Sequence, residues 1–409
     1  MAGQTPDATG NQFMRGFPPS PEKRVRADMV YLNPAITRWF MQHVREVECT
    51  ADVSSHGGAA TPLPVEPVDL DPVRISAGGD DTWTVAEMLA RTSTDGILVL
   101  SRGRVVYERR FALRPHVPHL CHSITKSIAA CVAANLVDRG LLDPEAAVTA
   151  YVPELAGSAY GDAQVRHLLD MTVGVRYTED HENDETEDAR LDRLCGVKPS
   201  RMPDEPGSAY DYATTTVKEG QHGRVLHYVS LNTDVLGWVM ERAAGSRMPD
   251  LIAQEVWSKL GAEDDAYIAL DGAGSAQLDG GLCCSLRDLG RFALMLLQGG
   301  CIDGRRVVPA SWIDDVRTGG NTAAFAAAPD CGLLPSGWSY RNCFWVGERT
   351  DHIPFMGIGM YGQMVYINRE ADVAVVKFSS QSRAADDVVV TRTFRALESL
   401  AVVLTEASG

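Results

Sequence analysis

Long apolar segments are missing from this sequence, and so is any excess of basic residues. No stretch of the 409 residues approaches the ~20 apolar residues that a membrane-spanning helix requires. The polar, Pro- and Gly-rich N-terminus has no apolar core of a secretion signal. The formal net charge of −16 argues against non-specific binding of nucleic acids or anionic membranes. We therefore expect a cytoplasmic protein whose partner is a small molecule, with no nucleic acid and no membrane as partners.

The signatures of several common enzyme classes are also missing. The nine cysteines form no CxxC pair and the ten histidines show no paired ligand spacing, so we expect reduced thiols and neither a metal nor a cofactor. No GxGxxG motif leads from a strand into a helix, and no GxxxxGK[ST] loop occurs, which argues against dinucleotide and P-loop nucleotide binding. The absence of a GxSxG elbow argues against the α/β-hydrolase form of serine catalysis.

The length and the order of the expected elements indicate two lobes preceded by an extension. At 409 residues the chain exceeds the usual size of a single core. Residues 1–75 are Pro-, Ala- and Gly-rich with one candidate helix, 34–48, so we expect an N-terminal extension that wraps the body loosely. We expect residues 76–150 and 276–409 to form a sheet-containing lobe, and residues 151–275 to form a helical lobe.

Hydrophobic periodicity and turn residues predict the main elements. Residues 96–101 and 104–108 flank an Arg-Gly turn and predict a β-hairpin. The β-rich segments 364–367 and 373–378 predict adjacent antiparallel strands. Helices are expected over 123–138, 235–244, 248–260, 285–297, 312–316 and 387–404. Strands at both ends with helices between them predict an α/β (α+β) fold, in which an antiparallel sheet is flanked by helices and an all-helical lobe is inserted.

Ser123 and Lys126 are the leading candidates for a catalytic pair. They lie three residues apart at the start of an apolar predicted helix, so their side chains share one helix face. Serine becomes an effective nucleophile when a base takes its proton, and lysine can serve when its surroundings lower its pKa. The same spacing recurs at Ser20 and Lys23, in a Pro-rich segment where no helix is expected. From context alone, a Ser123 helix cap followed by an exposed lysine is the alternative.

A tyrosine that exchanges protons with the lysine is expected in a Tyr-x-Asn or Tyr-x-Ser turn. Tyr228 fits, because Ser230 and an amphipathic helix follow it. Tyr31, Tyr340 and Tyr366 match the same pattern, and a packed, hydrogen-bonded tyrosine is the more common role of such a residue. The spacing alone does not choose among the four.

The third element is the glycine-rich segment Gly357-Ile358-Gly359, which precedes Met360, Tyr361 and a predicted strand. Glycines allow the backbone to approach a bound acyl group closely, where an N–H can be donated to it. A bulged edge of the sheet is the alternative interpretation of these glycines.

Taken together, these three elements resemble the class C β-lactamase and penicillin-binding-protein superfamily. Within it, the chain is most similar to the 6-aminohexanoate-dimer hydrolases (nylon-oligomer hydrolases) and related carboxylesterases. The resemblance covers roughly residues 95–400 and is carried by the segments 122–127, 148–157, 228–237 and 357–360. It implies a β-lactamase/transpeptidase-like fold and a serine hydrolase that cleaves linear amides or short-acyl esters.

The resemblance also implies roles for individual residues. It selects Tyr228 among the four tyrosines and implies an acyl-enzyme on Ser123, with Lys126 and Tyr228 as the proton-transfer pair. The backbone N–H groups of Ser123 and Met360 would hold the oxyanion, where each such donor contributes about 3–4 kcal/mol. An acyltransferase that uses the same acyl-enzyme and a non-catalytic binding protein of the same fold are the alternatives, and a homodimer is left open.

The residues expected to contact substrate depart from the family pattern. The strand that carries Lys-Thr-Gly in β-lactamases reads Gly-Ile-Gly here, so the cation that would bind a β-lactam carboxylate is missing. His181 and Asp279 stand where nylon-oligomer hydrolases carry a tyrosine and an asparagine, and Tyr361 replaces a histidine. Asp192 falls where an acidic residue favours a substrate ammonium group. These four residues are the predicted substrate contacts.

A strongly acidic loop spans residues 179–192. Charge runs of this kind are usually solvated faces of a protein. The alternative is a lid whose negative field attracts cationic substrates. The sequence leaves both interpretations open.

Overall fold

The computed structural model describes most of the chain. The described residues are 13–31, 33–111, 113–180, 183–196, 198, 207–328, 334–335, 337–348 and 352–406. Their strands are β1 (Thr50–Val53), β2 (Arg74–Gly78), β3 (Asp81–Thr84), β4 (Thr94–Ser101), β5 (Arg104–Arg110), β6 (His119–Leu120), β7 (Ala266–Ala269), β8 (Leu282–Cys284), β9 (Cys301–Ile302), β10 (Arg305–Arg306), β11 (Ser339–Arg341), β12 (Phe344–Val346), β13 (Phe355–Gly359), β14 (Gln363–Asn368) and β15 (Val373–Ser379).

The helices lie mainly in the middle of the chain. They are α1 (Pro34–Phe40), α2 (Val85–Arg91), α3 (Ile124–Asp138), α4 (Val148–Tyr151), α5 (Val165–Leu169), α6 (Glu187–Leu194), α7 (Ala209–Thr214), α8 (Leu231–Ala244), α9 (Met248–Ile252), α10 (Ser258–Leu260), α11 (Leu286–Leu297), α12 (Ala310–Thr318), α13 (Thr322–Ala326) and α14 (Asp387–Glu406). A π-helical turn, η7 (Ala253–Trp257), interrupts the single helix predicted over 248–260, which becomes α9, η7 and α10.

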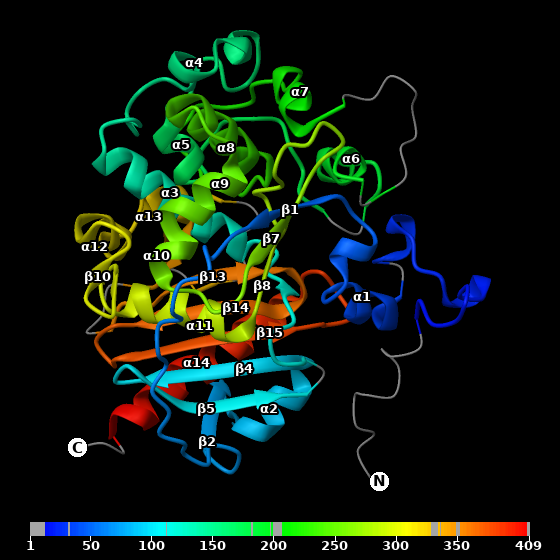
Figure 1. The fold of residues 1–409 in the computed structure, drawn as a ribbon. Helices are drawn as coiled ribbons and strands as arrows, with labels where there is room; N and C mark the ends of the chain where they lie inside the picture. The colour runs from blue at the N-terminus through cyan, green and yellow to red at the C-terminus, as the bar shows by residue number, and fades with distance from the viewer. Residues whose placement is uncertain are drawn as a thin grey trace.

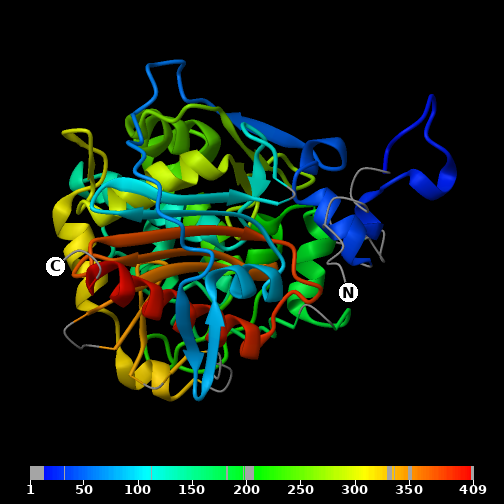
Figure 2. The same cartoon turned by 90° about the horizontal axis from the view of Figure 1, so that it is seen from below.

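The main sheet joins the two ends of the chain. Its seven antiparallel strands follow the order β11-β12-β13-β14-β15-β4-β5, and β15 pairs with β4 from a segment nearly 280 residues earlier (Figure 1). Every residue of β4, β14 and β15 is buried, which requires helices on both faces of the sheet. In Figure 2, α11 lies on one side of the sheet and α14 on the other. The predicted fold class, the hairpin and the adjacent strands near residue 370 are confirmed.

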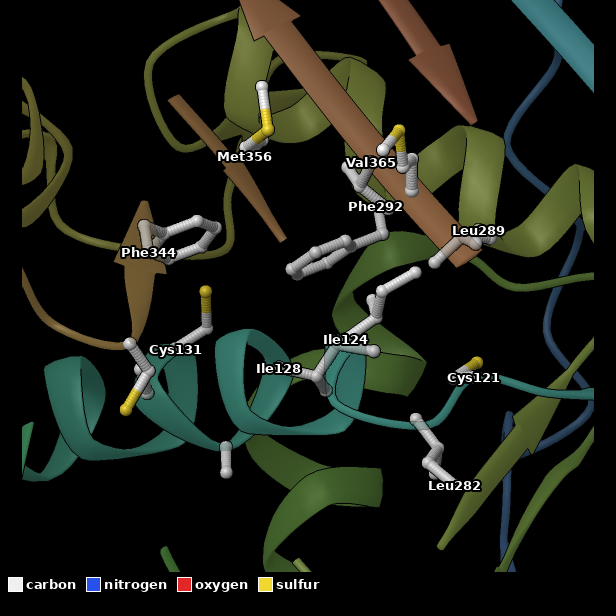
Figure 3. Packing of buried hydrophobic residues seen from close by; sticks show 14 of the residues in the cluster. Cys121, Ile124, Ile128, Cys131, Leu282, Leu289, Phe292, Phe344, Met356 and Val365 are labelled. Carbon is white, nitrogen blue, oxygen red and sulfur yellow. The ribbon is translucent and has the colours of Figure 1, made fainter. Parts of the chain in front are cut away.

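Helix α3 runs through the centre of the molecule. All thirteen residues from Ile124 to Leu136 are buried, so this helix is enclosed on every side, and it contacts both the sheet and the helical region. Figure 3 shows Ile124 and Ile128 on the side of α3 that faces Leu289 and Phe292 of α11. A helix held on all sides gives the residues at its N-terminus a well-defined position.

The N-terminal segment does not wrap the body loosely, and that expectation was wrong. Phe40 and Met41 are buried in the core, and β1 pairs with β7 to form the edge of a four-stranded sheet in the order β1-β7-β8-β6. The Leu120 N–H donates to Met41 O at 2.7 Å, which ties the segment to β6, just before Ser123. The strands β1 and β7 were not predicted, because a four-residue strand carries little periodic signal.

Two chemical features of the described residues bear on the expected environment. No helix among them has both the length and the apolar character needed to cross a bilayer. Their cysteines are all free thiols, and Cys121 Sγ lies 3.4 Å from Cys284 Sγ without a bond between them.

Packing of the N-terminal segment predicts its contribution to stability. Phe40 is 1% exposed, so Phe40→Ala should lower the free energy of unfolding by about 3–5 kcal/mol, because it leaves a cavity in the core. Urea unfolding followed by tryptophan fluorescence measures this change. Phe17→Ala is the matched control, because Phe17 belongs to the same segment and is fully exposed, and it should change stability by less than about 0.5 kcal/mol. Equal, small effects of both substitutions would contradict the packing described above.

Candidate active site

Ser123 stands at the junction between β6 and α3. The preceding residue, His122, has a left-handed backbone (φ 47°), and Ser123 occupies the helix N-cap position. Its side chain makes no capping hydrogen bond to the helix backbone. The Ser123 hydroxyl instead accepts a hydrogen bond from Lys126 Nζ at 2.9 Å, so it does not act as the helix cap that the sequence left open.

Lys126 is buried, with 1% of its surface exposed. Its ammonium donates to Ser123 Oγ, to Ser230 Oγ at 3.1 Å and to the backbone oxygen of Asp279. An exposed lysine behind a helix cap, the alternative from context, is therefore excluded. The Lys126 amine and the Ser123 hydroxyl form a direct contact.

The surroundings of Lys126 stabilise its charged form. Burial acts to lower the pKa of Lys126, but electrostatic interactions with Tyr228, Glu179, Asp279 and Asp234 act to raise it and hold that pKa above its usual range. A neutral lysine base would need the opposite shift. At neutral pH the group beside Ser123 is therefore an ammonium, which can stabilise a neighbouring anion.

Tyr228 completes the arrangement from the segment before α8. Its ring stacks on Trp345 at 5.5 Å between centroids, meets Tyr340 edge to face, and lies 5.2 Å from Lys126 Nζ. Burial raises the pKa of Tyr228, whereas the charge of Lys126 and hydrogen bonds with Ser123 and Lys126 act to lower it. The structure thus brings together the three residues that the resemblance selected.

The other tyrosines of the same pattern lie in different surroundings. Tyr340 packs against the Tyr228 ring, and Tyr366 packs in the core near Phe394. Tyr31 lines a cavity beside Ser123, although the sequence had offered it only as a match to the Tyr-x-Asn pattern.

Glu179 links the acidic loop to this arrangement. Its two carboxylate oxygens accept hydrogen bonds from the backbone N–H of Ser230 at 2.7 Å and from the Ser230 hydroxyl at 2.8 Å. Ser230 in turn accepts from Lys126. This first residue of the acidic loop is therefore part of the site and not only of a solvated face. The sequence did not identify Glu179 as a site residue, because no feature of the sequence distinguishes it from the other acidic residues of the loop.

Asp234 organises the opposite side of the lysine. It is 1% exposed, and its Oδ1 accepts from the backbone N–H groups of Leu278 and Asp279 at 2.9 and 3.1 Å. Burial raises the pKa of Asp234 well above its usual range. Asp234 therefore holds the N–H side of Asp279, and the carbonyl of the same residue accepts a hydrogen bond from Lys126.

The glycine-rich segment is not a bulge, because Gly357, Ile358 and Gly359 pair in unbroken register with β14, while β13 pairs with β12 at Phe355 and Met356. A side chain on Gly357 or Gly359 would collide with the start of α3. A Cβ at Gly359 would lie 2.7 Å from Cys121 O, and one at Gly357 would lie 3.0 Å from Ser127 Oγ. The absence of side chains at Gly357 and Gly359 therefore allows the end of β13, and Met360 after it, to pack close to Ser123.

Two cavities meet at Ser123, and Met360 borders both. The larger, of about 510 Å³, has mainly apolar walls that include Tyr177, Trp345 and Ile358. The smaller, of about 50 Å³, is bordered by carboxyl groups and by tyrosine and cysteine side chains.

Four carboxyl groups border the smaller cavity: Glu48, Asp188, Asp192 and Asp279. Among the described residues, Glu48 Oε1 and Asp279 Oδ1 receive no hydrogen bond. Burial raises the pKa of Glu48 to about 8 and also raises that of Asp279. Within the described part of the chain, no set of His, Cys, Asp or Glu side chains is arranged to hold a metal ion.

The predicted substrate contacts fall in three different situations. Asp192 and Asp279 border the smaller cavity. Tyr361 lies behind the cavity wall, stacked on Tyr31 at 5.4 Å between ring centroids and tilted against His122. His181 lies outside the described residues. Glu48 was missed, because an acidic residue at the end of a predicted helix carries no signal for a site 75 residues further along.

Comparison with known proteins shows the family of the chain. The β-lactamase family model matches residues 83–399. The chain is 36% identical over 345 residues to a 6-aminohexanoate-dimer hydrolase of Paenarthrobacter ureafaciens, which covers 84% of this chain and 85% of that protein.

Solved structures give the same result. A candidate 6-aminohexanoate-dimer hydrolase from Bacillus anthracis superimposes with a TM-score of 0.83 at 25% identity, over 98% of this chain and 99% of that one. A family VIII carboxylesterase superimposes with a TM-score of 0.51 at 19% identity, over 77% and 96% of the two chains, and shows the common fold. The chain therefore belongs to the β-lactamase family of serine hydrolases and is a hydrolase related to 6-aminohexanoate-dimer hydrolase.

Proposed function

We propose that the protein cleaves linear amides or short-acyl esters through an acyl-enzyme on Ser123. The observation that carries the proposal is the contact between a buried Lys126 ammonium and the Ser123 hydroxyl, with Tyr228 against both. The similarity to a hydrolase of 6-aminohexanoate dimers supports a linear amide as substrate. The missing lysine on the Gly-Ile-Gly strand disfavours β-lactams.

In the proposed acylation step, Ser123 Oγ bonds to the substrate carbonyl carbon while its proton passes to the ionised Tyr228 oxygen. Lys126 stays protonated and stabilises that phenolate by its charge, which fits the raised pKa of Lys126. The negative oxygen formed from the carbonyl would accept hydrogen bonds from the backbone N–H groups of Ser123 and Met360.

In the second half of the reaction, the bond to the amine or alcohol breaks and the leaving group takes the proton from Tyr228. Water then attacks the acyl-enzyme, giving its proton to the same tyrosine, and Ser123 is released with the proton returned to it. The larger apolar cavity would hold one side of the scissile bond and the smaller acidic cavity the other.

The smaller cavity supports a substrate with a cationic end. Asp192, Asp279 and Glu48 surround a space of about 50 Å³, which suits a single ammonium group. Two of their oxygens have no hydrogen-bond donor among the described residues, and a bound ammonium would supply donors to both. Tyr361 would act indirectly, because its ring supports Tyr31 at the cavity wall.

Covalent labelling tests the nucleophile. A fluorophosphonate should add once to the wild-type protein and not at all to Ser123→Ala, as measured by intact mass, because Ser230, the other hydroxyl that contacts Lys126 in this cavity, donates its proton to the Glu179 carboxylate. Ser20→Ala, in the second Ser-x-x-Lys sequence, should label like the wild type. Failure of the wild type to label, or labelling of Ser123→Ala, rejects the acyl-enzyme. Ligand binding without adduct or turnover would favour a non-catalytic role.

The pH dependence of acylation tests the proton-transfer pair. Burial and the charge of Glu179 both raise the pKa of Tyr228, so the rate should rise with pH as the base form appears. Glu179→Gln removes that negative charge and should move the acidic limb of log(kcat/KM) to lower pH by about one unit, equivalent to ~1.4 kcal/mol. Glu185→Gln, an exposed residue of the same loop, should leave the limb in place. A shift to higher pH in Glu179→Gln would contradict the assignment.

Substrate selectivity tests the acidic cavity. Glu48, with its pKa of about 8, becomes negative between pH 7 and 9 in the free enzyme, while a primary ammonium stays charged. The preference for an amino-terminated anilide over its uncharged isostere, as a ratio of kcat/KM, should therefore increase about tenfold over this range, since ~1.4 kcal/mol of added attraction is tenfold. Glu48→Gln should abolish the increase and leave the uncharged substrate unaffected. An increase that persists in the variant removes Glu48 from the site.

A further inference from the structure

The turn that carries Met360 has an unfavourable backbone conformation. Residues Met360–Gly362 connect β13 to β14, and within this turn Tyr361 has φ 59° and Gly362 has φ 91°. A left-handed conformation costs a non-glycine residue roughly 1–2 kcal/mol. The turn therefore needs contacts from outside itself to hold this conformation.

Each carbonyl of the turn accepts a hydrogen bond from outside the turn. Gln363 Nε2 donates to Met360 O at 3.0 Å, the backbone N–H of Gln381 donates to Tyr361 O at 3.1 Å, and Lys377 Nζ donates to Gly362 O at 3.3 Å. Two of these three donors are side chains of residues that are completely buried in the main sheet, Gln363 on β14 and Lys377 on β15.

Gln363 fastens the turn to the end of β15. Besides Met360 O, its Nε2 donates to Ser379 O at 2.7 Å, and its Oε1 accepts from the Ser379 N–H at 2.9 Å. The side-chain amide therefore makes three directed hydrogen bonds in a buried position. An apolar side chain of similar volume would fill the space and make none of them.

Lys377 has no role in the proposed reaction, although it is a fully buried lysine. Its Nζ also donates to Thr92 O at 3.4 Å and to Ser379 Oγ. Burial lowers the pKa of Lys377 to about 7, although the charge of Asp95, which is itself paired with Arg38 at 2.8 Å, acts to raise it. Burying an amine is unfavourable unless its hydrogen bonds are satisfied, and here one of them holds the carbonyl that ends the turn.

We propose that Gln363 and Lys377 are positioning residues that hold the Met360 N–H in place as an oxyanion donor. A donor stabilises the oxyanion only when it stands 2.7–3.1 Å from the place where that oxygen forms, so a small displacement of the turn weakens it. Neither residue borders the two cavities at Ser123, so both act through the turn. The inference rests on the proposed acyl-enzyme mechanism.

A carbonyl-to-thiocarbonyl comparison tests the inference. Sulfur is larger than oxygen and accepts hydrogen bonds weakly, so a working oxyanion site favours an ester over the matching thionoester. In Gln363→Met, the ester-to-thionoester ratio of kcat/KM should fall at least tenfold, mainly through kcat for the ester. Lys377→Met should also lower this ratio, because it removes the hydrogen bond that Lys377 Nζ donates to Gly362 O.

The control is a buried amide elsewhere in the molecule. Asn135 on α3 donates to Glu255 O and Val307 O, both at 2.9 Å, far along the helix from Ser123. Asn135→Leu removes comparable hydrogen bonds, so it should lower stability and leave the ratio unchanged. Gln363→Asn, which keeps a shorter amide, replaces Gln363→Met if that variant does not fold.

The outcomes separate this inference from the proposed function. If wild-type protein acylates but the Gln363 and Lys377 variants keep the wild-type ratio, the positioning role is wrong and the acyl-enzyme stands. A ratio that falls equally in Asn135→Leu would also overturn it, because general destabilisation would then be the cause. If the wild type forms no acyl-enzyme, the proposed function itself fails.

Discussion

The active site depends on the burial of one ammonium group, that of Lys126. Removing a charged amine from water costs several kcal/mol, and this cost is offset only where acceptors and carboxylates surround it. Glu179, Asp234 and the Asp279 peptide supply that surrounding from three separate segments, so the site forms only when those segments assemble. The same charges disfavour a neutral lysine, which is why the proposed chemistry gives the proton to Tyr228.

The fold provides this arrangement by fixing the start of α3. The helix is buried on every side, the glycines of β13 allow the sheet to press against its first residues, and the N-terminal segment holds β6 in front of it. Ser123 therefore sits where the sheet, the helical region and the N-terminal segment meet. The N-terminal segment also contributes Tyr31 and Glu48 to the wall of the smaller cavity at Ser123.

The two cavities at Ser123 differ in chemistry, and this difference can orient a substrate. The larger has apolar and aromatic walls, and the smaller has carboxyl groups, of which Glu48 and Asp279 have their charged form disfavoured by burial. A cation that enters the smaller cavity would restore that charge and be held by it. In this arrangement, the orientation of the substrate depends on electrostatics at one end and on apolar packing at the other.

The sequence by itself determined the features that depend on local spacing. Ser123 and Lys126 share a helix face because they are three residues apart, and the hairpin and α3 follow from short-range periodicity and turn residues. Tyr228 required the family resemblance, because its motif is short and recurs at other tyrosines. Only the tertiary structure decided that Glu48 borders the site, because that contact joins segments far apart in the chain. Contacts of this kind come from packing between distant segments, and no periodic pattern in the sequence records them.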